Sequence, residues 1–186
     1  MLHPETLLEQ LRAAPAETMA ALRAADDGAP ILGALALASE PRARALLCDA
    51  LGFRKQASAV DALIACLADD SARVRSSAAD ALAKIGDPRA GAALLRSAAL
   101  PDPDAGARRM QVAALGAVGH QPAVPLLTAL LGDADPSLRG SAAWSLGALR
   151  AASAEPALRQ ALQVELAPYP AERMRAALAA LASAPR

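Results

Sequence analysis

Aromatic residues are nearly absent from this chain: phenylalanine, tryptophan and tyrosine make up 2% of its 186 residues, although 54% are hydrophobic. Alanine, leucine and valine therefore supply the apolar surface. Such side chains suit thin helices that pack closely together, whereas a sheet core needs β-branched and aromatic residues. The composition favours an all-α protein.

Cysteine is also scarce, since Cys48 and Cys66 are the only two. Both fall on apolar helical stripes, which predicts buried free thiols. The formal net charge is zero, with nineteen basic and nineteen acidic residues, and lysine is rare. Nucleic-acid binders are basic overall or on one face, and only the second case remains open here.

Long apolar runs are missing as well. No stretch of about 18 residues is free of charge and proline, so no membrane span is expected. Glu5 and Glu9 interrupt the first apolar run and no basic segment precedes it, which argues against a secretory signal. These absences predict a cytoplasmic protein.

A repeat dominates what is present. Residues 69–90 are typical of one short helix between two turns, and altered copies recur along the chain. A fixed period of roughly 20–50 residues is the signature of a solenoid. Each copy has a first helix (A) with paired leucines, a turn that is acidic in most copies, and a second helix (B) with a central leucine. These anchor leucines are spaced by 31, 33, 31 and 32 residues, at Leu51, Leu82, Leu115, Leu146 and Leu178.

The same alignment predicts how the helices begin, pack and end. Gly52, Gly116 and Gly147 directly follow anchors, where a missing side chain lets neighbouring helices approach closely. Gly86 and Gly119 are expected to end helices in a left-handed conformation. Phe53 is expected in the core. The B helices are expected to start with caps at Glu40, Ser71, Asp104, Asp135 and Ala167, of which the serine and the two aspartates have good capping side chains.

The N-terminal segment departs from the repeat. Residues 4–25 are expected to form a divergent helix pair that ends at a break around Asp26 and Asp27. A terminal repeat is atypical because one of its faces has no neighbour. We therefore expect one domain over residues 1–186, with a capping pair at 1–28, repeats at 29–182 and a tail at 183–186.

The best copy, residues 75–90, has the pattern R-x-x-A-A-x-A-L-x-x-I-G-D-P-x-A. This pattern resembles the HEAT-like repeat of phycobilisome lyases and of many bacterial regulatory proteins. The resemblance covers residues 29–182 and implies a bacterial, armadillo-like protein. Its fold would be a right-handed α-solenoid of about five to six HEAT-like helix pairs. The same repeat serves many roles, so it fixes no function.

A column of arginines stands seven residues before the anchors, at Arg44, Arg75, Arg108 and Arg139. The resemblance implies a structural ladder, in which each arginine pairs with an acidic residue of a neighbouring turn. A catalytic or ligand-binding array is the alternative. The candidate partners are Asp69, Asp70, Asp102 and Asp133.

Helical spacing places the positions six, five and two residues before each anchor on the exposed face of the B helices. The resemblance implies that this concave face binds partners. Tryptophan, methionine and arginine are enriched at interface centres, and two aspartates would add an acidic edge. Alternatively, Trp144 packs over an alanine-rich gap, because tryptophan is highly buried on average. The predicted partner-binding residues are Trp144, Arg109, Met110, Arg173, Asp80, Asp49 and Ser141.

No enzyme-like pattern is found. His3 and His120 lie far apart in sequence, neither cysteine has a histidine near it, and no phosphate-binding loop follows a strand. We expect no catalytic residue, no cofactor, no metal and no small-molecule ligand.

The predicted function is a non-catalytic scaffold or regulatory adaptor subunit that binds another protein on its concave face. Two alternatives remain open through the resemblance. One is a bilin-lyase-type enzyme subunit, for which the few aromatics offer little surface to stack on a tetrapyrrole. The other is a HEAT-like nucleic-acid-binding protein, which the neutral charge disfavours.

Overall fold

The computed structural model describes residues 3–24 and 28–183. This part of the chain contains twelve α-helices and five short 3-10 helices, and no strand. The predicted all-α fold of HEAT-like helix pairs is confirmed. The break expected at Asp26 and Asp27 and residues 184–186 of the expected tail lie outside the described residues.

The chain divides into two compact units, residues 1–90 and 91–186, and each is described by itself. The first unit has three helix pairs, and in the third pair 3-10 turns precede α5 and follow α6. α4 packs along α6, and each also contacts the A helix of its own pair. The pairs are α1 (Pro4–Ala13) with α2 (Pro15–Ala24), α3 (Ala29–Leu37) with α4 (Pro41–Phe53), and α5 (Val60–Cys66) with α6 (Ala72–Ile85).

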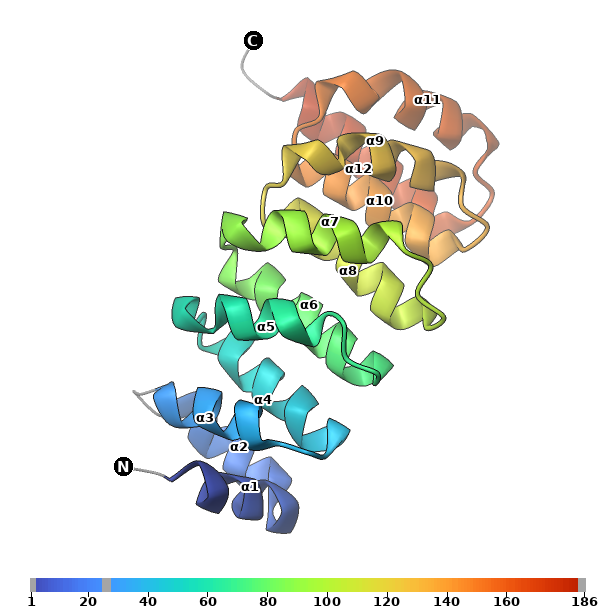
Figure 1. The fold of residues 1–186 in the computed structure, drawn as a ribbon. Coiled ribbons are helices and arrows are strands. Elements are labelled where there is room, and N and C mark those ends of the chain that lie inside the picture. The colour runs from blue at the N-terminus through green and yellow to red at the C-terminus, as the bar shows by residue number, and fades with distance from the viewer. Residues whose placement is uncertain (1–2, 25–27, 184–186) are drawn as a thin grey trace. The chain divides into compact units, whose positions relative to one another are not determined.

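The second unit repeats this arrangement. α10 contacts both α8 and α12, and Figure 1 shows the A helices of this unit as one layer and its B helices as another. Pro136 and Pro168 begin B helices, where a missing N–H costs nothing. The pairs are α7 (Gly91–Ala99) with α8 (Ala105–Ala117), α9 (Val124–Ala129) with α10 (Pro136–Ala148), and α11 (Glu155–Val164) with α12 (Pro168–Ala182).

The anchor leucines form the core of each unit. Leu51 and Leu82 in the first unit, and Leu115 and Leu146 in the second, are fully buried. Leu178 on α12 is only half-buried. α12 is the last B helix of the described chain, so it has a neighbouring B helix on one side only.

The glycines that follow the anchors have the predicted packing role. A Cβ atom at Gly52 would lie 2.5 Å from the Cα atom of Ala81, and one at Gly147 would lie 2.9 Å from the Cα atom of Ala177. Any side chain there would push the backbones of neighbouring B helices apart. Gly86 and Gly119 have φ angles of 71° and 72°, which is the expected left-handed conformation.

The predicted caps are confirmed at two aspartates and wrong at one serine. Asp104 and Asp135 accept hydrogen bonds of 2.8 Å from backbone N–H groups in the first turns of α8 and α10. The Ser71 side chain makes no such bond. The N–H group of Ser71 instead donates to Asp69 Oδ1 at 2.9 Å, so the preceding acidic turn organises the start of α6.

The prediction that Phe53 lies in the core is also wrong. Its side chain is 56% exposed, and Arg23 lies over its ring at 5.1 Å. Gly52 already occupies the position that faces α6. The next residue of a helix is turned by about 100°, which directs Phe53 away from that contact.

The cysteines differ in their burial. Cys48 on α4 is buried as predicted, but Cys66 at the end of α5 is only half-buried, and both are free thiols. A hydrogen bond to Cys66 and burial raise the pKa of Cys48, so its thiol stays protonated.

No helix in the described residues is long and apolar enough to cross a membrane.

Candidate functional site

The predicted partner-binding residues are distributed over both units. The first unit holds Asp49 on α4 and Asp80 on α6. Burial is the main cause that raises the pKa of Asp49, and a hydrogen bond from Ser77 opposes it. Asp80 forms an ion pair with Lys84 one turn along α6. The expected acidic edge is therefore partly neutralised within its own unit.

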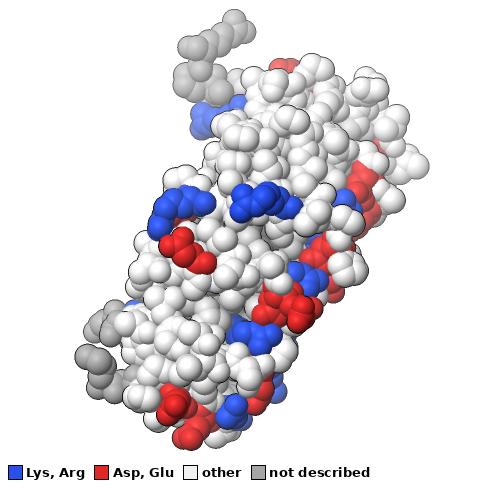
Figure 2. Space-filling view, viewed as in Figure 1, with Lys and Arg blue, Asp and Glu red and all other residues white. Residues whose placement is uncertain are grey.

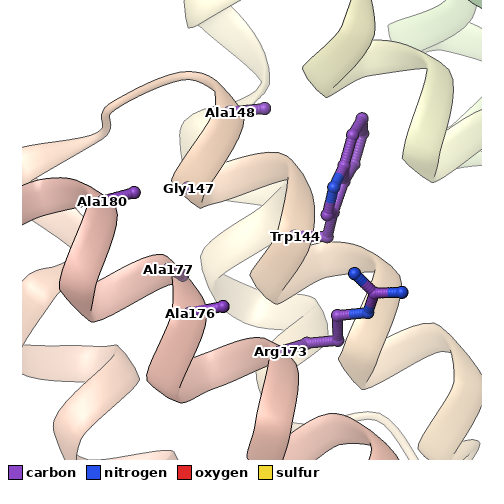
Figure 3. A pocket seen from close by; sticks show the side chains of 7 residues that line it. All are labelled: Trp144, Gly147, Ala148, Arg173, Ala176, Ala177 and Ala180. Atoms are coloured by element: carbon purple, nitrogen blue, oxygen red, sulfur yellow. The ribbon is translucent and has the colours of Figure 1, made fainter.

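Trp144 stands over a groove in the second unit. Its side chain projects from α10 and is 39% exposed. The groove has a volume of about 300 Å³ and runs between α10 and α12. Figure 3 shows Trp144 and Arg173 on one side of it and small residues along the rest. This larger groove is lined by Trp144, Gly147, Ala148, Arg173, Ala176, Ala177 and Ala180.

A smaller groove, with a volume of about 180 Å³, lies beside the larger one. Trp144 and Arg173 line both grooves, so they form the border between them. The remaining lining residues come from α8, α10 and α12, namely Ala113, Ser141 and Tyr169. All three B helices of the second unit therefore contribute to one small area of surface.

The Arg173 side chain is held by an aromatic ring. Its guanidinium carbon lies 5.4 Å from the centre of the Tyr169 ring, a cation–π contact within α12. Tyr169 in turn lies against Gly140 of α10, where a Cβ atom would come within 2.3 Å of a ring carbon. Tyr169 was not among the predicted partner-binding residues. Its only signal was the glycine at position 140, where the other copies carry side chains.

The structure brings together only some of the predicted residues. Trp144, Arg173 and Ser141 line a common groove, whereas Arg109 and Met110 line neither groove. Arg109 is exposed and Met110 is half-buried on α8. The prediction that Ser141 is exposed is wrong: although it lines the smaller groove, it is only 5% exposed.

The arginines of the column lie near the start of the B helices, and their side chains reach residues of the turns. Arg44 donates to both carboxylate oxygens of Asp69, from Nε at 2.7 Å and from Nη2 at 2.9 Å. Arg108 Nη1 lies 3.2 Å from Asp133 Oδ2. Arg75 donates to the backbone carbonyl oxygens of Asp69 and Asp70 at 2.8 and 3.0 Å. These arginines tie helix ends to turns.

Glu165 is the partner of Arg139, and it was not among the predicted acidic partners. Arg139 donates to the two Glu165 oxygens at 2.6 and 2.8 Å, and the Glu165 side chain is only 4% exposed. Glu165 Oε1 also accepts a 2.9 Å bond from the N–H of Ala167, at the start of α12. The hydrogen bonds from Arg139 are the main cause that lowers the pKa of Glu165.

This pair makes stability depend on pH. Because the pKa of Glu165 is lowered in the folded state, its contribution is fully present above its unfolded-state pKa of about 4.3 and is lost as pH falls through the folded value. We expect Glu165→Gln to destabilise the fold by about 2 kcal/mol at neutral pH. The variant should also lose less of its remaining stability between pH 6 and pH 3, measured by urea unfolding.

Glu155→Gln is the matched control for that experiment. Glu155 pairs with Arg159 on α11, but the two side chains are 45% and 66% exposed. Exposed pairs contribute at most about 1 kcal/mol, so this variant should resemble the wild type. Equal effects of both substitutions would contradict the special role of Glu165.

Metal-ligating side chains are not clustered in the described chain. Across residues 3–24 and 28–183, no group of three or more His, Cys, Asp or Glu side chains is placed to hold a metal ion. The two grooves on either side of Trp144 together form a region that we call the Trp144 surface. Apart from Tyr169 and Arg173, no acidic or basic residue lines it. Its arrangement can bind through apolar contact and one positive charge.

The comparisons with known proteins agree with the fold. HEAT repeats match residues 29–101 and 92–182. The structure of the complex of CpcE and CpcF of phycocyanin lyase from Nostoc sp. PCC7120 contains a chain of 25% identity with a TM-score of 0.68. This match covers 81% of this chain and 99% of that one. No curated protein matches the sequence.

Designed armadillo repeat proteins are also similar. One was computationally designed for modular peptide recognition, with 20% identity, a TM-score of 0.57 and coverage of 95% of this chain and 86% of that one. Another is in complex with the peptide (KR)4, with 20% identity, a TM-score of 0.53 and coverage of 96% and 87%. At such identities the likeness concerns the fold alone. Because HEAT repeats account for residues 29–182, the chain belongs to the HEAT repeat family.

Proposed function

We propose that this protein is a non-catalytic interaction module that binds a partner protein on the concave face formed by its B helices. The observation that carries the proposal is Trp144, an exposed tryptophan between two grooves with Arg173 at their border. Tryptophan and arginine are the residue types most enriched at energetic centres of interfaces. Stacked repeats present extended surfaces suited to such binding.

The proposal assigns different tasks to the two sets of arginines. Arg44 and Arg139 are engaged by carboxylates in the turns, and we assign them to stability. Arg173 forms no ion pair with any described residue and faces the grooves. Arg109 and Met110 on α8 would extend the binding surface beyond the grooves. For the first unit, considered by itself, we propose Asp49 and Asp80 as partner-binding residues.

The relatives support a binding role through their architecture. One similar structure is a complex of two proteins, and the designed armadillo proteins recognise peptides. Fold alone does not fix function, so the proposal depends on the Trp144 surface. Mixed charge weighs against nucleic acid as the partner: nineteen acidic residues balance nineteen basic ones, and the charged side chains on the face drawn in Figure 2 are of both signs.

The second candidate is a subunit of a lyase-type enzyme that handles a bilin. It is favoured by the likeness to a chain of the phycocyanin lyase complex, which extends over nearly all of that chain. A bilin-handling subunit should change the absorbance spectrum of a free bilin on mixing. An unchanged spectrum at micromolar protein would exclude this candidate for the isolated chain.

Affinity capture from the native host tests the first candidate. The baits are the wild type, Trp144→Glu and Val164→Glu, and the bound proteins are identified by mass spectrometry. Val164 is 76% exposed at the end of α11, so its variant controls for a new charge away from the grooves. A protein recovered by the wild type and the control but lost from Trp144→Glu is expected. The same proteins on all three baits would place binding elsewhere.

A further inference from the structure

We infer that the Trp144 grooves bind an extended peptide segment that carries a carboxylate and, about three residues away, an apolar side chain. This inference rests on the proposed function and names the chemical class of the partner. Three features carry it: the presentation of Arg173, the floor of the larger groove, and the absence of acidic side chains from the lining of both grooves.

Arg173 is positioned to bind a carboxylate of the ligand. Its guanidinium lies over the Tyr169 ring, so one face of the cation is covered while the N–H donors at its edge remain available. Those donors match the two oxygens of a carboxylate. In the same unit Arg139 already makes this kind of contact with Glu165, whereas Arg173 has no carboxylate partner among the described residues.

The floor of the larger groove fits a main chain with small or apolar side chains. Gly147, Ala176 and Ala180 leave room for a backbone to approach, and Trp144 forms a flat apolar wall. From Arg173 to Ala180 is seven helical residues, which is about 10 Å. An extended segment covers that length with about three residues.

The charge of the lining selects between ligands. Arg173 is the only charged residue that lines either groove. A lysine or arginine side chain would therefore meet a like charge with no acidic group to compensate it, which costs binding free energy. A basic segment such as (KR)4, which one similar designed protein binds, is accordingly disfavoured here.

Gly140 positions this arrangement without touching the ligand. A side chain there would collide with the Tyr169 ring and displace the support of Arg173. Gly140→Ala is therefore expected to weaken binding of acidic peptides more than binding of their uncharged counterparts. A purely structural role would weaken both equally.

The test is a binding selection with peptides of defined charge. A library of eight-residue peptides with blocked ends is divided into acidic, uncharged and basic classes, and each class is offered to the wild type, Arg173→Gln and Arg175→Gln. Arg175 is exposed on the same helix and lines neither groove, so its variant loses the same charge elsewhere. Selected peptides are titrated against the fluorescence of Trp144, the only tryptophan of the chain.

We expect the wild type and Arg175→Gln to select acidic peptides and to show a saturable change in fluorescence. Arg173→Gln should bind them at least about tenfold more weakly, as should peptides in which the acid is replaced by its amide. Selection of uncharged or basic peptides that depends on Trp144 would overturn the acidic class but keep the proposed function. Selection of no peptide would overturn this inference. The affinity capture with the Trp144→Glu bait would then test the proposed function independently.

Discussion

Replacing Gly116 by alanine is expected to destabilise the second unit by about 3 kcal/mol. The sign is unusual, because the same change in an exposed helix interior stabilises by about 1 kcal/mol. At Gly116 the new Cβ would lie 2.6 Å from the Cα atom of Ser145 on α10. A backbone atom cannot rotate away, so α8 and α10 must separate and lose close packing along their contact.

A buried hydrogen bond is part of this cost. Ser145 is fully buried, and its hydroxyl donates to the backbone oxygen of Val112 at 2.9 Å. The same Cβ would lie 2.8 Å from that hydroxyl oxygen. Displacing it leaves polar groups unpaired in the core, which costs about 1–3 kcal/mol when the bond is lost.

Thermal unfolding followed by circular dichroism measures the effect of Gly116→Ala. A loss of 3 kcal/mol should lower the midpoint by about 6–12 °C for a chain of this size. Gly132→Ala is the control, because no atom lies within 4 Å of a Cβ at that position. An unchanged or raised midpoint for Gly116→Ala would mean that the helices do not pack as closely as described.

Trp144→Glu is expected to weaken partner binding at least about 30-fold, the loss typical of an interface residue worth about 2 kcal/mol. The variant removes the apolar wall of the larger groove. It also places a carboxylate beside Arg173, where it would compete with the partner for the guanidinium. Stability should change little, since the Trp144 side chain is 39% exposed and is not part of the leucine core.

Isothermal titration with the captured partner measures this loss. Trp144→Phe should retain most of the affinity because it keeps an aromatic wall, and Val164→Glu should bind like the wild type. Equal affinity of the wild type and Trp144→Glu, with both folded, would remove Trp144 from the interface. Loss of affinity together with an early melting transition would indicate that Trp144 supports the fold.

The sequence predicted a residue's role correctly where the contacts that define this role recur in each copy of the repeat. The four fully buried anchors, the glycines at Gly52, Gly116 and Gly147, and the caps at Asp104 and Asp135 all occupy equivalent positions in several copies. A side chain at such a position meets a similar neighbour each time. Alignment of the copies against one another was therefore enough to predict its role.

The predictions that went wrong concern positions where one copy differs from the others. Ser141 occupies a position where the polar residues of other B helices, Ser77 and Arg173, are half-buried, yet it is only 5% exposed. Phe53 follows a glycine that already faces the next helix, so it turns outward. Periodicity describes the average copy and misses these departures.

The helical repeat, its period and the residues of its core thus follow from the order of amino acids, because leucines and small residues at fixed spacing can be buried in one way only. The candidate site arises differently. Tyr169, Gly140 and Arg173 come from two helices and meet only when α10 and α12 pack, and Glu165 reaches Arg139 across 26 residues of chain. Contacts between distant segments depend on how the helices pack, and neither pattern nor spacing records that packing.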